Sequence, residues 1–192
     1  PVVDADGHTE FFGRGSLQAF RHLQSRFNVV AALTDAYMPS CDASTLKKLK
    51  IERCAVISQP DWSAELLAPA LENGECVAIK INLGFMHVYA DDSRLQALYA
   101  LAKRYGVPVL FHTGDTGWRQ AKLKYSHPLT LDDVITDYPE VNFMLVHSGN
   151  PWFADAAVLA AKNENVWLEL SSLVEGPLGS TPKNSIARLM CD

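Results

Sequence analysis

The chain has 192 residues, 48% of them apolar and 20% charged, a composition typical of a globular domain rather than a disordered or fibrous chain. Its 17 Lys and Arg residues face 22 Asp and Glu residues, so the net charge is −5 and no basic patch points to nucleic acid. No apolar run is long enough to cross a bilayer, so we expect no membrane partner.

The four cysteines bear on the cellular compartment. They lie far apart without a Cys-x-x-Cys pair, and Cys54 and Cys76 each open an apolar, strand-like run. Buried, reduced thiols fit this distribution better than a disulfide framework, and no leader precedes the first apolar run. We therefore expect a cytoplasmic protein.

Six short apolar runs predict buried strands. They are nearly continuous rather than alternating, which is typical of a parallel sheet covered on both faces. In chain order they are Val2–Asp4, Cys54–Ser58, Val77–Ile81, Pro108–His112, Asn142–His147 and Val166–Leu170.

Helical patterns alternate with the later runs. Expected helices are Ala64–Glu72, Arg94–Tyr105, Thr130–Asp137 and Trp152–Lys162. Thr130 is the expected N-cap of the third helix, and Gly106 ends the second. This alternation predicts an α/β fold, either an open doubly wound sheet or a closed barrel. The absence of a glycine-rich phosphate loop after the first run disfavours a dinucleotide-binding sheet.

Polar side chains stand at the ends of several predicted strands. In a barrel the carboxyl ends of all strands open on one face, so such side chains converge there, whereas an open sheet spreads them along an edge. This distribution favours the barrel. The residues are Asp6, His8, Lys80, Asn82, His112 and His147.

Asp6 and His8 are two positions apart, so an extended backbone turns both side chains to the same side. A carboxylate and an imidazole placed in this way can clamp one divalent ion. A tight turn at Asp6-Gly7 explains the same residues without a ligand, and both interpretations stay open.

His112 and His147 each end a predicted strand and precede a small hydroxyl residue and a glycine, Thr113-Gly114 and Ser148-Gly149. One histidine at a strand end is more often structural than a ligand. Two in the same pattern indicate a site, because the small residues let a ligand approach the backbone closely.

Three further residues are candidates for substrate binding: Lys80, Asn82 and His127. Lys80 lies inside an apolar run, so it must reach a carboxylate, a substrate or the barrel mouth, although an ordinary salt bridge is an equal alternative. His127 lies in a loop and either lines the mouth or is exposed. Asp115 and Trp118 could line a pocket beyond the fourth run.

Five of these segments resemble the amidohydrolase superfamily, in its branch of amidohydrolase-related hydrolases and aminocarboxymuconate-semialdehyde decarboxylase-like enzymes. The likeness covers the first ten residues and most of residues 75–172, and the segments come in the family's order. They are Val2–His8, Ala78–Phe85, Gly106–Gly114, Tyr138–Gly149 and Asn165–Ser172.

The resemblance implies one metal-dependent (β/α)8 TIM-type barrel domain over residues 1–192. It makes Asp6, His8 and His112 metal ligands and His147 the catalytic group beside the metal. Asp6 replaces the family's usual first histidine, and some decarboxylases of the branch carry a carboxylate there. The implied cofactor is therefore a divalent ion, Zn²⁺ or Mn²⁺. Barrels of this branch are often dimers, so the resemblance also allows a homodimer.

The expected barrel is incomplete. A full barrel of this type usually needs about 250 residues. The family's last strand carries an aspartate in a Gly-x-Asp context, which nothing before Asp192 matches. The stretch from Ser58 to Ala78 has room for one helix, where we expect a helix, a strand and another helix. Segments that lie outside this sequence and a natural, degenerate barrel are both compatible with this pattern.

The expected function is metal-dependent hydrolysis of a small carboxylated or cyclic substrate. The ion would lower the pKa of a bound water or polarise a substrate oxygen, with His147 as general base or acid. Non-oxidative decarboxylation uses the same layout and is the alternative. A second alternative is a non-catalytic barrel that has lost its metal site.

Overall fold

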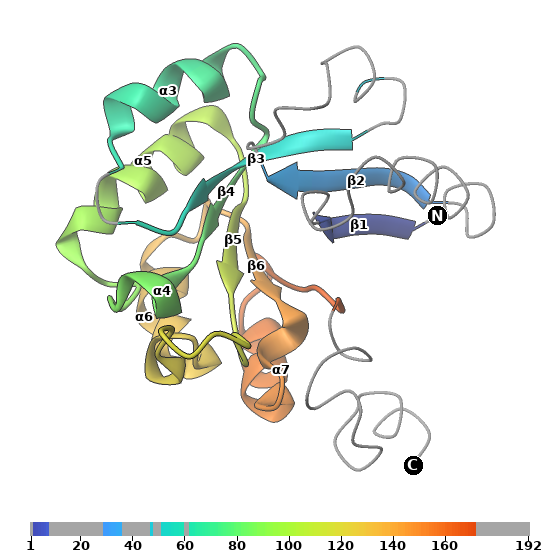
Figure 1. Cartoon of the computed structure of the whole chain (residues 1–192), viewed down its shortest axis with the longest axis vertical. Coiled ribbons are helices and arrows are strands. Elements are labelled where there is room, and N and C mark those ends of the chain that lie inside the picture. Colours follow the sequence, from blue (N-terminus) through green and yellow to red (C-terminus); the bar gives the residue numbers. More distant parts are fainter. Residues whose placement is uncertain (1, 8–28, 36–46, 48–50, 60–61, 172–192) are drawn as a thin grey trace.

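The structure is a computed structural model that describes residues 2–7, 29–35, 47, 51–59 and 62–171. Seven parallel strands form one sheet in which every strand pairs with the next one along the chain (Figure 1). They are β1 (Val2–Gly7), β2 (Val29–Asp35), β3 (Ile51–Ile57), β4 (Ala78–Ile81), β5 (Val109–His112), β6 (Phe143–Val146) and β7 (Val166–Leu168).

Helices connect the later strands, and α3 and α5 pack side by side against the sheet (Figure 1). The α-helices are α3 (Ala64–Glu72), α4 (Leu83–Met86), α5 (Gln96–Tyr105), α6 (Asp132–Asp137) and α7 (Phe153–Lys162). Short 3₁₀ helices are η3 (Ser93–Leu95), η4 (Leu123–Tyr125), η5 (Pro128–Leu131) and η6 (His147–Gly149). No helix in the described part of the chain is long and apolar enough to span a bilayer.

Local sequence explains where the two longer helices of the first half begin and end. Ser63 caps α3, because its hydroxyl accepts a hydrogen bond from Leu66 N at 3.2 Å. Gly106 ends α5 with a φ of 66°, a left-handed conformation that glycine adopts without strain. Tyr99 anchors α5 in the core, where its hydroxyl donates to Ala90 O at 2.7 Å and burial raises its pKa.

The strand order is that of a (β/α)-barrel, in which successive parallel strands are neighbours. Among the described residues β1 and β7 are the two edge strands, so this part of the chain forms an incomplete barrel. The predicted α/β class and barrel order agree with this arrangement. Cys54 and Cys76 are buried free thiols, also as expected.

Two sequence expectations are wrong, and one strand was not predicted. β3 pairs directly with β4, from Cys54↔Ala78 to Ile57↔Ile81, so α3 completes the crossover and no strand is missing between Ser58 and Ala78. The strand β2 was not predicted from the sequence, because its alanines have weak strand propensity. Thr130 does not cap an α-helix; it lies inside η5, and α6 begins only at Asp132.

The two faces of the sheet have different cores. Facing the helices is a large cluster that includes Ile79, Ile81, Val109, Phe111, Phe143 and Leu145. On the opposite face is a small one of Cys54, Ala78, Leu110 and Val146. Because side chains alternate along a strand, Lys80 lies on the second face, where it is 2% exposed. This second face is the interior face of the barrel.

Candidate active site

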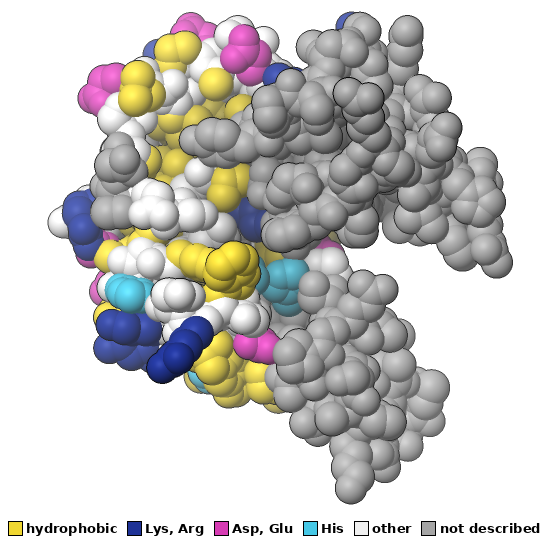
Figure 2. Space-filling model, viewed as in Figure 1, with side chains coloured by type: hydrophobic (Ala, Val, Ile, Leu, Met, Phe, Trp, Pro, Cys, Tyr) yellow, Lys and Arg dark blue, Asp and Glu magenta, His cyan; other side chains and the backbone are white. Residues whose placement is uncertain are grey.

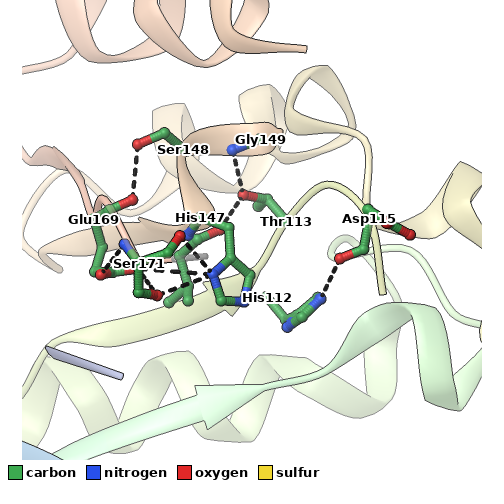
Figure 3. A network of polar contacts seen from close by, with 9 residues as sticks. His112, Thr113, Asp115, His147, Ser148, Gly149, Glu169 and Ser171 are labelled. Atoms are coloured by element: carbon green, nitrogen blue, oxygen red, sulfur yellow. Dashed lines mark hydrogen bonds and ion pairs between the residues drawn. The ribbon is translucent and has the colours of Figure 1, made fainter. Parts of the chain in front are cut away.

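Two histidines meet at the carboxyl ends of neighbouring strands. His112 is the last residue of β5, and His147 directly follows β6. Their ring centroids are 4.7 Å apart and the rings are nearly perpendicular, at 77° (Figure 3). The structure thus brings together the two residues whose strand-end patterns matched in the sequence.

The turn that directly follows β6, called here the β6 turn, has a left-handed backbone at three successive residues. The φ angles of His147, Ser148 and Gly149 are 64°, 47° and 72°. Each non-glycine residue in this region costs about 1–2 kcal/mol, so other contacts must hold the turn. Glu169 Oε2 accepts from His147 N at 3.1 Å, and Glu169 O accepts from the Ser148 hydroxyl at 2.7 Å.

A buried threonine ties the turn to β5. The Thr113 hydroxyl donates to Val146 O at 2.6 Å and accepts from Gly149 N at 2.9 Å (Figure 3). Thr113 directly follows His112, so one side chain links the segments that carry both histidines.

Gly114 permits a second link between the same loops. Its φ is 84°, and a Cβ there would collide with the Asn150 carbonyl oxygen and lie 2.8 Å from Asn150 N. The adjacent Asp115 N donates to that carbonyl at 2.7 Å. The glycine in the first His-Thr-Gly pattern is therefore required by a close approach of two backbones.

A backbone carbonyl lies against one nitrogen of each histidine ring. His112 Nε2 lies 3.2 Å from Asp115 O, and His147 Nδ1 lies 3.1 Å from Ser171 O. A carbonyl only accepts, so each of these ring nitrogens carries a hydrogen. Histidines that bind metals are usually oriented in this way by an acceptor behind the ring, so the two imidazoles fit the nitrogen donors of a divalent site.

The remaining expected ligands are not placed by side-chain geometry. Asp6 lies in β1, whose side chains are not described, and His8 lies outside the described residues. Among the residues that the structure does describe, no group of three or more His, Cys, Asp or Glu could hold a metal ion. The full ligand set therefore stays a prediction.

An aromatic wall adjoins His112. Phe85, in α4, meets the His112 ring edge-on at 6.3 Å, and Trp118 lies 6.4 Å from Phe85. Trp118 is 60% exposed. Histidine and hydrophobic side chains lie next to each other on this face of the molecule (Figure 2). Phe85 was not singled out from the sequence, where it only extends the motif after Asn82.

Lys80 lies in the carboxyl half of β4, and Asn82 directly follows the strand. Asn82 follows Ile81, which pairs with Phe111, so Asn82 stands level with His112. Its Nδ2 donates to the Ser58 hydroxyl at 2.7 Å. Its buried Oδ1 has no hydrogen-bond partner in the described part of the chain, so it can still accept one.

His127 turns toward α7. Its Nδ1 accepts from Leu129 N at 3.3 Å, its Nε2 lies 3.4 Å from Asp155 Oδ2, and its ring lies 4.7 Å from Trp152. These contacts give His127 a structural role as the cap of η5. A role in binding substrate stays a prediction.

The comparison with known families decides what this barrel is. The sequence profile of the family described as Amidohydrolase matches residues 14–188. The chain belongs to the amidohydrolase family. The resemblance read from the five segments is thereby confirmed, and the protein is an enzyme of the amidohydrolase superfamily.

Solved structures share the barrel fold with this amidohydrolase. An uncharacterised TIM-barrel protein from Bordetella bronchiseptica aligns with a TM-score of 0.69 at 17% identity, covering 93% of this chain and 78% of its own. A probable 2-pyrone-4,6-dicarboxylic acid hydrolase from Acinetobacter baumannii aligns with a TM-score of 0.63 at 17% identity, covering 95% and 73%. These matches confirm the TIM-type barrel.

Two other relatives are more distant or partial. The 5-carboxyvanillate decarboxylase of Novosphingobium aromaticivorans, complexed with manganese, aligns with a TM-score of 0.50 at 12% identity, covering 86% of this chain and 73% of its own. Protein fluG of Emericella nidulans is 39% identical over 66 residues, which is 34% of this amidohydrolase but only 8% of fluG.

Proposed function

We propose that this amidohydrolase is a metal-dependent hydrolase of a small carboxylated or cyclic substrate. The observation that carries the proposal is the facing pair His112 and His147, each ring held from behind by a carbonyl. In this proposal Asp6, His8 and His112 bind Zn²⁺ or Mn²⁺, and His147 is the catalytic group.

The proposed reaction is hydrolysis of an ester or lactone. A bound divalent ion supplies positive charge that lowers the pKa of water or polarises a substrate oxygen. His147 accepts a proton from water as the water oxygen bonds to the acyl carbon. The carbon–oxygen bond then breaks, and His147 returns the proton to the leaving oxygen.

The substrate sits between the polar end of β4 and the aromatic wall. Lys80 and Asn82 hold the carboxylate or carbonyl oxygens of the substrate. A contribution of His127 requires its ring to turn away from Trp152 and Asp155. Phe85 and Trp118 flank a flat ring. The relative named as a probable 2-pyrone-4,6-dicarboxylic acid hydrolase supports a planar, carboxylated class of substrate.

Non-oxidative decarboxylation is the second candidate. Asp6 places a carboxylate where the family usually has histidine, and a manganese-bound decarboxylase shares the fold. In that reaction the bond between the ring carbon and the carboxylate breaks, carbon dioxide leaves, and His147 delivers a proton to the ring carbon. Incubation with 2-pyrone-4,6-dicarboxylate or with 5-carboxyvanillate separates the two, because only the second substrate releases carbon dioxide.

Further parts of the proposal concern the domain, the location and the partners of this amidohydrolase. A single barrel domain over residues 1–192, a cytoplasmic location and a homodimer are part of the proposal, as is the absence of nucleic-acid and membrane partners. The test of the homodimer is the mass of the purified protein in solution.

Metal analysis tests the proposed ligands. We expect the purified protein to bind one divalent ion, and Asp6→Ala and His112→Ala each to weaken that binding by at least about 10–100-fold, since each removes a donor atom. Elemental analysis after dialysis against limiting Zn²⁺ or Mn²⁺ measures the loss, with His87→Ala as a histidine control.

Retention of the ion by both ligand variants would contradict the assigned site. If the unchanged protein binds no divalent ion, and none restores turnover of either substrate, the enzyme proposal fails. A barrel that has lost its metal site, the remaining alternative, then accounts for the chain.

Trp118→Ala tests the aromatic wall. Stacking on a ring contributes about 0.5–1.5 kcal/mol, so we expect KM for a cyclic substrate to rise about 2–10-fold with little change in kcat. Leu66→Ala, which truncates an exposed apolar side chain on α3, is the control. An unchanged KM in Trp118→Ala would remove this residue from the substrate site.

A further inference from the structure

Glu169 directly follows β7 and is directed at the β6 turn. Its side chain is 10% exposed. Its Oε2 accepts from His147 N at 3.1 Å and from the Ser171 hydroxyl at 2.8 Å, and its Oε1 accepts from Ser171 N (Figure 3). One nearly buried carboxylate thus binds both the backbone of the proposed catalytic histidine and the residue behind its ring.

The Ser171 hydroxyl transmits this arrangement to the imidazole. Because its hydrogen is donated to Glu169, the hydroxyl oxygen offers only lone pairs to His147 Nδ1, which lies 3.0 Å away. The second neighbour of Nδ1 is the Ser171 carbonyl at 3.1 Å, which is also an acceptor. A nitrogen between two acceptors must carry the hydrogen, so in the neutral ring the lone pair belongs to Nε2.

We infer that Glu169 and Ser171 are positioning residues that hold His147 in the Nδ1–H tautomer, with Nε2 as the proton-accepting atom. The inference rests on the proposed role of His147 as general base. A carboxylate that fixes the tautomer of a catalytic imidazole is familiar from serine hydrolases, where the two groups touch directly. Here a serine hydroxyl stands between them, since Glu169 Oε2 is 4.0 Å from His147 Nδ1.

The left-handed turn supports a positioning role. Without its hydrogen bond to Glu169, the backbone of His147 would lose a partner while keeping the strain of its φ of 64°. The same carboxylate therefore fixes two things, where the ring sits and which nitrogen is basic.

Nitrogen-15 NMR of the histidine rings reads the tautomer without any substrate. The signals of His147 are those that vanish in His147→Asn, with spectra recorded at a pH where the ring is neutral. We expect a protonated-type shift at Nδ1 and an unprotonated-type shift at Nε2. The reverse pattern in the unchanged protein would overturn the inference, whatever the enzyme assays show.

Glu169→Gln tests the carboxylate. An amide offers one acceptor oxygen in place of two, so we expect a mixture of tautomers and a fall in kcat of about 10–100-fold, with KM nearly constant. The control is Glu140→Gln, which removes a surface carboxylate bound to Lys103 and should leave both readouts unchanged. Unchanged tautomer and kcat in Glu169→Gln would also overturn the inference.

Ser171→Ala and Ser171→Thr cover the case in which Glu169→Gln does not fold. Loss of the hydroxyl in Ser171→Ala should lower kcat and increase exchange between the tautomers of His147. Ser171→Thr keeps a hydroxyl, so its kcat and its tautomer should match those of the unchanged protein. Equal behaviour of the two variants would show that the hydroxyl has no positioning role. Metal content and substrate turnover test the proposed function separately, so the two failures are distinguishable.

Discussion

His147→Asn is expected to lower kcat about 10²–10⁴-fold, the usual contribution of a positioned general acid or base. Asparagine is the suitable replacement, because it tolerates the left-handed backbone that His147 adopts with a φ of 64°. The fold should therefore survive. Turnover of 2-pyrone-4,6-dicarboxylate and of 5-carboxyvanillate measures the loss of activity. The midpoint of thermal unfolding shows whether the fold is retained.

His87→Asn is the matched control for this variant. His87 also has a left-handed backbone, with a φ of 58°, but its exposed ring bonds to Gln120 O and stacks on Tyr125. We expect its kcat to change little. If His147→Asn retains full kcat, or if both variants lose activity equally, His147 is not the general base.

Gly114→Ala is expected to destabilise the protein by about 2–5 kcal/mol. About 1–2 kcal/mol comes from placing a Cβ at a φ of 84°, and about 1–3 kcal/mol from overlap with the Asn150 backbone, which cannot rotate away as a side chain would. Relief of that overlap must move the loops after β5 and β6 apart. Activity should therefore fall along with the free energy of unfolding, measured in urea.

Gly106→Ala separates the cost of a left-handed backbone from the cost of the overlap with Asn150. Gly106 has a φ of 66°, but a Cβ there meets nothing within 4 Å. Its cost should be the backbone cost alone, about 1–2 kcal/mol, without loss of activity. Equal destabilisation of the two variants would show that the approach of Gly114 to Asn150 does not constrain the loops.

The fold could be predicted wherever local sequence and burial agree. The later strands are short apolar runs between capped helices, and periodicity finds such elements. β2 was missed because its alanines suit a helix as well as a strand, and only pairing with β1 and β3 decides between them. Thr130 was misplaced because Pro128 favours a 3₁₀ turn before the α-helix begins.

The juxtaposition of two candidate site residues could be predicted because each carries its own sequence signal. His112 and His147 end apolar runs in the same pattern, and the structure places their rings in contact. Glu169 carries a comparable signal, a charge at the end of an apolar run, but its target is a backbone N–H in the turn after another strand. No sequence pattern specifies such a partner, since it depends on the register of β6 and β7.

The bridging hydroxyl of Thr113 has a consequence for motion. It joins the segment after β5 to the turn after β6, and it is 1% exposed, so water cannot readily replace either of its hydrogen bonds. We therefore expect fluctuations of one loop to be carried into the other, so that His112 and His147 move together. A ligand that touches both rings meets a pair whose relative freedom was already lost on folding, so little further entropy is lost on binding.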